Sequence, residues 1–187
     1  MVSFSTVKKF LSPSTNSRSG KFTEKITVWE KSELFWLAFS APGTKHAVGR
    51  DLAVHLCNSS GFDATIAKNL RRDDVSFFIG KHRTCLKFAT LGDEGSYIFE
   101  QIRGRNYQIL FLLGLSPQNA HIWIFLKDKF LPHLTIQHQS GKDKWMHIRP
   151  QNSEWINPSS PPEWIRKQSG DLAEFPSTLK EILAELP

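Results

Sequence analysis

The sequence has few cysteines and no long hydrophobic run. Its two cysteines, Cys57 and Cys85, are too few for a disulfide scaffold and do not have the spacing of a zinc site. The densest apolar runs, 109–115 and 122–126, are far shorter than the roughly 20 residues of a membrane-spanning helix. The N-terminus lacks the basic patch, apolar stretch and cleavage site of a secretory signal. We therefore expect a cytoplasmic protein of the cell interior that does not contact a membrane.

The composition is that of a globular domain with a basic charge balance. Of the 187 residues, 40% are hydrophobic, and 14 Phe, 6 Trp and 2 Tyr can fill a core. Lys and Arg number 24 against 18 Asp and Glu, which gives a net charge of +6. A basic balance favours a polyanionic partner, and nucleic acid is the leading candidate. The alternative is that the extra lysines serve only solubility.

The pattern along the chain predicts a single domain with an arm and an extension. Residues 1–24, rich in Ser, Thr and Lys, are expected to form an N-terminal arm, and residues 25–187 a single domain. Within it, residues 127–187 are a C-terminal extension and a candidate DNA-contacting region. Periodicity predicts helices at 27–40, 47–58, 97–107 and 179–186, a hairpin from 75–79 and 83–90, and buried strands at 109–113 and 121–126. This order implies an α/β (α+β) fold, a sheet flanked by helices.

A lysine and a carboxylate are expected to meet on the hairpin. Cys85 and Lys87 are two residues apart on one strand, so their side chains leave the same face. Asp74, at the start of the preceding arm, can lie near Lys87 across the ladder. Lys87 lies between Leu86 and Phe88 in an expected central strand, where its burial would be costly without an acidic partner.

Three runs in this region resemble a known family. They are Asp-Val-Ser-Phe-Phe at 74–78, Cys-Leu-Lys-Phe-Ala-Thr at 85–90 and Phe-Glu-Gln-Ile-Arg at 99–103. Together they resemble the PD-(D/E)XK nuclease superfamily, in particular type II restriction endonucleases and related prokaryotic nucleases, over roughly residues 74–125. The resemblance implies a restriction-endonuclease-like mixed sheet and hydrolysis of DNA with Mg²⁺. It also implies that Asp74 binds the metal and that Lys87 orients or activates the attacking water.

The sequence departs from the family pattern in two places. Asp73, and not proline, precedes Asp74, and Cys85 occupies the position of the metal-binding glutamate two residues before the lysine. A neutral thiol is a poor ligand for Mg²⁺, which prefers oxygen. Some restriction enzymes carry a small residue there and supply the carboxylate from the following helix, about a dozen residues after the lysine. Glu100 has this spacing, with 12 residues (88–99) between it and Lys87.

The resemblance therefore implies a metal site with Asp74 and Glu100 as ligands. Enzymes of this migrated type often add an acid from an N-terminal helix, for which Glu33 is the candidate, with Glu30 behind it. Taken singly, each acid also has a structural explanation. Asp74 can begin a strand beside two arginines, and Glu100 can be an exposed helix residue that pairs with Arg103.

Polar and basic side chains near Glu100 and in the C-terminal region are candidate DNA contacts. The candidates are Gln101, Arg103, Arg105, Lys142 and Lys144. The first three would lie on or after the helix that carries Glu100, where they could reach the phosphate backbone. The alternatives are a solvated basic face and, for the C-terminal region, a subdomain held by its tryptophans.

Three functions follow, in order of preference. The first is an Mg²⁺-dependent, sequence-specific endonuclease of double-stranded DNA, of restriction type II, acting as a homodimer because palindromic sites require two related active sites. The second is a catalytically inactive DNA-binding protein of the same fold, in which Cys85 marks the loss of the metal site. The third is a structural or regulatory protein, which scattered basic residues would favour.

Overall fold

The structure is a computed structural model that describes residues 2–12, 28–68, 74–136, 144–148, 165 and 167–187. Its helices are α1 (Phe4–Leu11), α2 (Phe35–Ala38), α3 (Pro42–Ser59), α4 (Lys127–Phe130), the 3₁₀ helix η2 (Leu131–His133) and α6 (Phe175–Ala184). Its strands are β1 (Ala64–Ile66), β2 (Phe77–Ile79), β3 (His82–Thr90), β4 (Tyr97–Ile102), β5 (Ile109–Leu115), β6 (Ala120–Leu126), β7 (Thr135–Ile136) and β8 (Lys144–Ile148). No helix in this described part of the chain is both long and apolar enough to span a bilayer.

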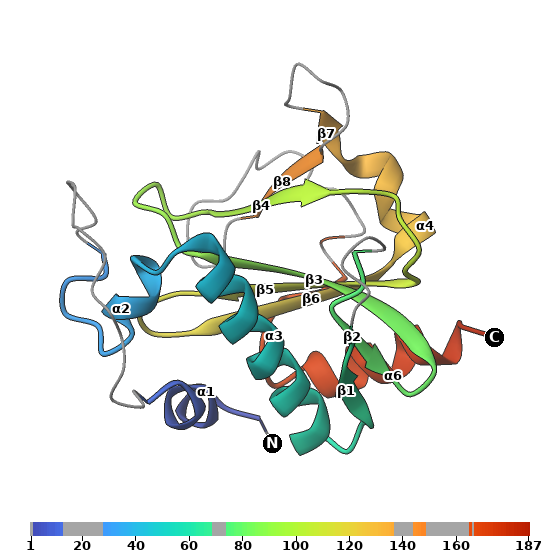
Figure 1. Ribbon diagram of the computed structural model, residues 1–187, viewed down its shortest axis with the longest axis horizontal. Coiled ribbons are helices and arrows are strands. Elements are labelled where there is room, and N and C mark those ends of the chain that lie inside the picture. The colour runs from blue at the N-terminus through green and yellow to red at the C-terminus, as the bar shows by residue number, and fades with distance from the viewer. Residues whose placement is uncertain (1, 13–27, 69–73, 137–143, 149–164, 166) are drawn as a thin grey trace.

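Two sheets and a layer of helices make up the fold. The larger sheet has the order β1-β2-β3-β5-β6, in which β3 and β5 are parallel and the other neighbours antiparallel. The smaller sheet, β4-β8-β7, lies over one face, and α1, α3 and α6 lie on the opposite side (Figure 1). The expected fold class, a mixed sheet flanked by helices, is therefore confirmed.

The central strands bury side chains on both faces and so contribute to two cores. On β3, Leu86 packs on the helix side, whereas Cys85 packs toward the smaller sheet. On β5, Phe111 and Leu110 divide in the same way. Burial on both faces explains why the strands expected at 109–113 and 121–126 are almost continuously apolar.

The expected hairpin is present, and its turn contains a glycine in a left-handed conformation. β2 pairs with β3 from Phe77 opposite Thr84 to Ile79 opposite His82. Gly80, between the strands, has a φ of +56°, a left-handed conformation that glycine adopts without steric cost. This pairing positions Asp74, just before β2, toward the second half of β3.

Helix α3 begins earlier than the expected helix at 47–58. Pro42 lies in its first turn, where a missing N–H costs nothing because that N–H has no partner within the helix. The segment Ala41-Pro42-Gly43, which follows directly on the helix expected at 27–40, is therefore the start of α3. The helix approaches β3 closely at Gly49, where an added Cβ would lie 2.5 Å from Cγ of Phe88.

The helix expected at 97–107 is wrong, because this segment forms strand β4. Tyr97 and Phe99 are buried, whereas Glu100, the next residue of the strand, is exposed. A bulge between Phe99 and Ile102 breaks the period-two alternation and brings Ile102 back into the core. The bulge makes the apolar spacing resemble that of a helix, which explains the wrong prediction.

Three further segments differ in part from the elements that the sequence predicts. In the helix expected at 27–40, only α2 is helical among the described residues. The last helix begins at Phe175, with a proline in its first turn, and not at residue 179. Within the expected N-terminal arm, α1 buries Val7 and Leu11 in the helix-side core. The division of the chain at residues 24 and 126 stays a prediction.

Candidate functional site

The second half of β3 has a free edge that lines two clefts. β2 is short, and its pairing with β3 stops at Thr84. The next β3 amide on this side, that of Leu86, donates to the side-chain oxygen of Ser76 at 3.0 Å. Two clefts lie along this part of β3: both are lined by residues of α3, and one of them also by residues of β4.

The larger space, called here the Asp74 cleft, has a volume of about 810 Å³. Asp74 and Lys87 both line it, together with Cys85 from β3 and His46 and Arg50 from α3. The two residues that were expected to meet across the hairpin therefore line the same cleft.

Asp74 has an unusual backbone conformation and a carboxylate oxygen that accepts no hydrogen bond. Its φ is +56°, a left-handed conformation, and its side chain is 18% exposed. Oδ2 is buried and accepts no hydrogen bond. Nε of Arg105 lies 3.5 Å from Oδ2, an ion-pair distance longer than a normal hydrogen bond. A buried carboxylate oxygen that accepts no hydrogen bond can still gain free energy from a ligand that supplies one or from a cation.

Lys87 is fixed by the bulge of β4. Its Nζ donates a 2.7 Å hydrogen bond to the carbonyl oxygen of Gln101. Gln101 has a φ of +54°, and it shares this conformation among described non-glycine residues only with Asp74. Both strained residues therefore flank Lys87, and backbone strain of this kind collects at functional sites.

Glu100 lies in a second space, called here the Glu100 cleft, of about 390 Å³. Lys87 and His46 line both clefts, so the two spaces adjoin at these residues. Glu100 comes from β4 and not from a helix, and its side chain is exposed. Asp74 and Glu100 thus lie in neighbouring clefts on either side of Lys87.

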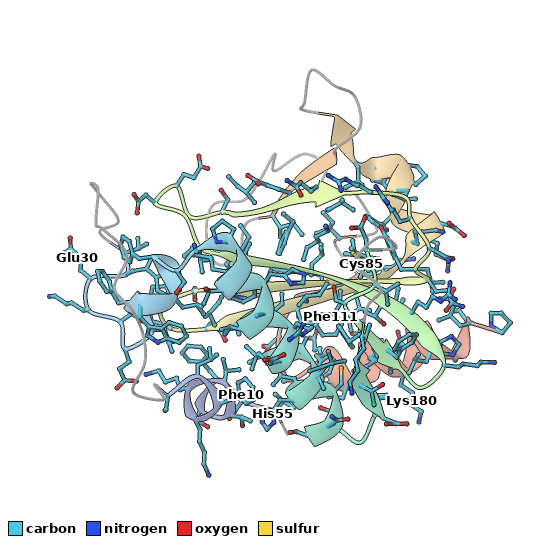
Figure 2. All side chains as sticks on the ribbon, in the orientation of Figure 1. Phe10, Glu30, His55, Cys85, Phe111 and Lys180 are labelled. Atoms are coloured by element: carbon cyan, nitrogen blue, oxygen red, sulfur yellow. The ribbon has the colours of Figure 1, made fainter. Side chains whose placement is uncertain are left out.

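Cys85 offers no charged ligand at neutral pH. It is 1% exposed, and Figure 2 shows its position in the interior. Burial raises the pKa of its thiol to about 12, with Lys87 opposing the rise and Asp74 adding to it. We expected Cys85 to be a poor ligand for Mg²⁺, and a thiol that keeps its proton fits this expectation.

Glu33 and Glu30 are not brought to the clefts. Glu33 is 76% exposed and pairs with Lys8 of α1 at 3.1 Å. Glu30 lies at the end of the molecule away from Cys85 (Figure 2). The prediction that Glu33 or Glu30 supports the metal site from a helix is therefore wrong. The segment that carries them forms turns beside α1 and not a helix across the sheet.

The expected DNA contacts divide into three groups. Gln101 presents its carbonyl to Lys87, and Arg105 is paired with Asp74. Arg103 follows β4 and is partly buried. Lys144 begins β8, and Lys142 lies outside the described residues.

Three basic residues of α3 were missed by the sequence analysis. Lys45, His46 and Arg50 line the clefts. Lys45 donates to Oγ1 of Thr90 at 3.3 Å, and burial lowers its pKa. Arg50 pairs with Asp51 at 2.9 Å. The signal that could have found them is Pro42 as a helix start, which places all three on α3.

The clefts contain few metal-ligating side chains. Across the described ranges, no group of three or more His, Cys, Asp and Glu residues is placed to hold a metal ion. Mg²⁺ commonly binds through one or two carboxylates and completes its shell with water and substrate phosphates. The unsatisfied Oδ2 of Asp74 fits such a ligand, with Glu100 as the other candidate.

Comparison with known proteins gives little guidance. No protein-family model matches the chain, and no curated protein matches it either. A solved structure of a bacterial homing endonuclease superposes with a TM-score of 0.48 and 12% sequence identity, covering 78% of this chain and 97% of that chain. A likeness at this level carries no conclusion about function.

Proposed function

We propose that the chain is an Mg²⁺-dependent endonuclease that hydrolyses phosphodiester bonds of double-stranded DNA. The observation that carries this proposal is that Asp74 and Lys87 line one cleft, with a buried oxygen of Asp74 that accepts no hydrogen bond. The finer form of the proposal is sequence-specific cutting of the type II restriction kind. A palindromic target would then require a homodimer.

In this proposal Asp74 and Glu100 hold the metal and Lys87 acts on the attacking water. When bound, Mg²⁺ supplies a Lewis acid that stabilises negative charge on the phosphoryl oxygens. A lysine ammonium has three donors, so Lys87 can orient water and stabilise the developing negative charge. Its bond to the Gln101 carbonyl fixes one donor and leaves others for water and phosphate.

The basic residues of α3 supply contacts to the DNA backbone. Lys45, His46 and Arg50 line the wall opposite Lys87. The ammonium of Lys45 is partly desolvated and bonds a neutral hydroxyl, so a phosphate would be a favourable partner. Contacts of this kind fix the position of the duplex and carry no sequence information.

A second candidate function is DNA binding without cleavage. The observation that favours it is the protonated thiol of Cys85. In the nuclease superfamily that the sequence resembles, a metal-binding carboxylate occupies this position. Glu100 is exposed in the adjoining cleft, and no contact between Glu100 and Asp74 fixes the pair. The two functions share the basic wall of α3 and differ in whether Glu100 completes the metal site.

Cleavage and binding of the same DNA separate the two candidates. A large mixed-sequence duplex is incubated with the protein and about 10 mM Mg²⁺, a concentration suited to a weakly held hard cation. The variant Glu100→Gln removes the carboxylate charge, and Glu94→Gln is the control because Glu94 is exposed in the loop before β4.

The endonuclease proposal expects discrete fragments from the wild type and from Glu94→Gln. It expects their loss in Glu100→Gln and in excess EDTA, with DNA binding retained. Binding without any fragments would instead establish the inactive DNA-binding protein.

A further inference from the structure

Arg105 is the cation that the structure places against the buried oxygen of Asp74. Its Nε lies 3.5 Å from Oδ2 of Asp74, which is an ion-pair distance and too long for a normal hydrogen bond. Oδ2 therefore has a positive charge beside it but accepts no hydrogen bond from the described residues. Arg105 thus offsets the charge of the carboxylate without saturating the oxygen.

The contact with Asp74 holds the guanidinium of Arg105 only weakly. The side chain of Arg105 is 46% exposed, whereas that of Asp74 is 18% exposed. An ion pair with an exposed member contributes little free energy, because water competes for the charged group. Arg50, which lines the same cleft, is held more firmly, because its Nε and Nη2 donate to Asp51 at 3.0 and 2.9 Å. Of these two arginines, Arg105 is the one that a competing cation can replace more easily.

The backbone at Arg105 is held independently of this contact. Arg105 lies between β4 and β5, and its amide donates to the carbonyl oxygen of Arg103 at 2.9 Å. Nζ of Lys127 donates to the carbonyl oxygen of Arg105 at 3.3 Å. The guanidinium can therefore leave Asp74 by rotation of a half-exposed side chain, while the backbone stays in place.

We propose that Arg105 takes the place of the metal on Asp74 in the metal-free protein, and that its guanidinium leaves Oδ2 when a divalent cation binds. The inference rests on the proposed function, in which Asp74 is a metal ligand. Mg²⁺ lies about 2.1 Å from its oxygen ligands, and repulsion between like charges opposes a guanidinium beside the same oxygen. The released guanidinium presents a fork of donors that suits a phosphate. Metal binding would thus prepare the cleft for the DNA backbone.

Titration calorimetry with Mn²⁺, in the absence of DNA, tests this competition through binding and not through activity. Arg105→Gln removes the competing guanidinium, so we expect it to bind Mn²⁺ at least about threefold more tightly than the wild type does. Arg50→Gln is the matched control, because it removes the same charge from the same cleft and leaves the contact with Asp74 intact. This control should tighten binding less. Equal tightening in both variants would indicate a general effect of charge and overturn the proposal.

NMR spectra of the guanidinium nitrogens follow Arg105 in the wild type and need no variant. As Mg²⁺ is added, we expect the Nε–H of Arg105 to exchange faster with water, because it no longer faces a carboxylate. The Nε–H of Arg50, which donates to Asp51 at 3.0 Å, is the control and should exchange at an unchanged rate. An Arg105 signal that exchanges no faster at saturating Mg²⁺ would contradict the release of the guanidinium.

The outcomes separate this inference from the proposed function. If the wild type binds Mn²⁺ and Arg105→Gln binds it no more tightly, the competition is overturned and the proposed function stands. Asp74→Asn assigns the measured site, because asparagine tolerates the left-handed conformation at position 74 but lacks the charge. Mn²⁺ binding that is absent from the wild type and Arg105→Gln, or unchanged in Asp74→Asn, would overturn both, because Asp74 would then hold no metal.

Discussion

At the scale of single residues, the surroundings of Lys87 suit this side chain to bind an anionic ligand. Its side chain is half-buried, and the hydrogen bond of its ammonium goes to the neutral carbonyl of Gln101. No carboxylate of the described residues lies within ion-pair distance of it, although Asp74 lines the same cleft. An ammonium whose hydrogen-bond partner is neutral is well suited to an anionic ligand such as a phosphate.

His121 gives a prediction for the pH dependence of stability. Its ring stacks on Trp123, and burial lowers its pKa to about 4, with Asp171 opposing the shift. The unfolded chain, with a histidine pKa near 6.5, binds this proton more tightly than the folded protein. The contribution of the neutral ring is therefore complete above about pH 6.5 and is lost as the pH falls toward 4.

Urea unfolding from pH 7 to pH 4 measures this effect. We expect the wild-type midpoint to fall more steeply with acidification than that of His121→Gln. The control is His55→Gln, because His55 stacks on Phe10 at the surface of α3 and should not alter the slope. Parallel pH profiles for the wild type and His121→Gln would contradict the account.

At the scale of elements, the contact between α3 and β3 sets the distance across the clefts. Gly49 allows this approach, because its Cβ would clash with Phe88. Gly49→Ala should lower the free energy of unfolding by about 1–3 kcal/mol, as overpacking does. It should also weaken DNA binding, because α3 carries Lys45 and His46.

Gly43→Ala on the same helix is the matched control. An added Cβ there meets nothing within 4 Å. Its stability should stay unchanged or rise by up to about 1 kcal/mol, because alanine favours helix. Denaturation and DNA titration of both variants check the pair, and equal losses in the two would show that the close approach at Gly49 is unimportant.

The elements differ in how well the sequence predicts them. The hairpin and the strands β5 and β6 follow from period and turn chemistry, since Gly80 marks the turn and burial on both faces makes β5 apolar. β4 was mistaken for a helix because its bulge breaks the alternation. Bulges and tertiary pairing are set by partners far along the chain, which local periodicity does not contain.

The same contrast holds for the candidate site. The approach of Asp74 to Lys87 could be predicted, because hairpin register is local. The positions of Glu33 and Arg105 could not, because each depends on how distant elements pack. Lys45 was missed for the same reason, since it belongs to no recognisable motif.

At the scale of the whole molecule, the net charge of +6 is expected to act through the wall of α3. If Lys45 contacts one phosphate, Lys45→Gln should reduce the slope of log affinity against log salt by about 1. Lys180→Gln is the control, because Lys180 is exposed on α6, a helix that lines neither cleft; Figure 2 labels its position. A reduction of the same size in both variants would indicate that binding depends on general charge and not on this wall.

Single-turnover cleavage by Lys87→Ala tests the central claim most directly. The control is Lys81→Ala, because Lys81 is exposed in the turn between β2 and β3. With duplex DNA and Mg²⁺ in excess, we expect Lys87→Ala to lose on the order of a hundredfold or more in rate, with DNA affinity retained. We expect Lys81→Ala to cut at the wild-type rate. Equal cleavage by Lys87→Ala and the wild type would contradict the assignment of this cleft as the site of hydrolysis.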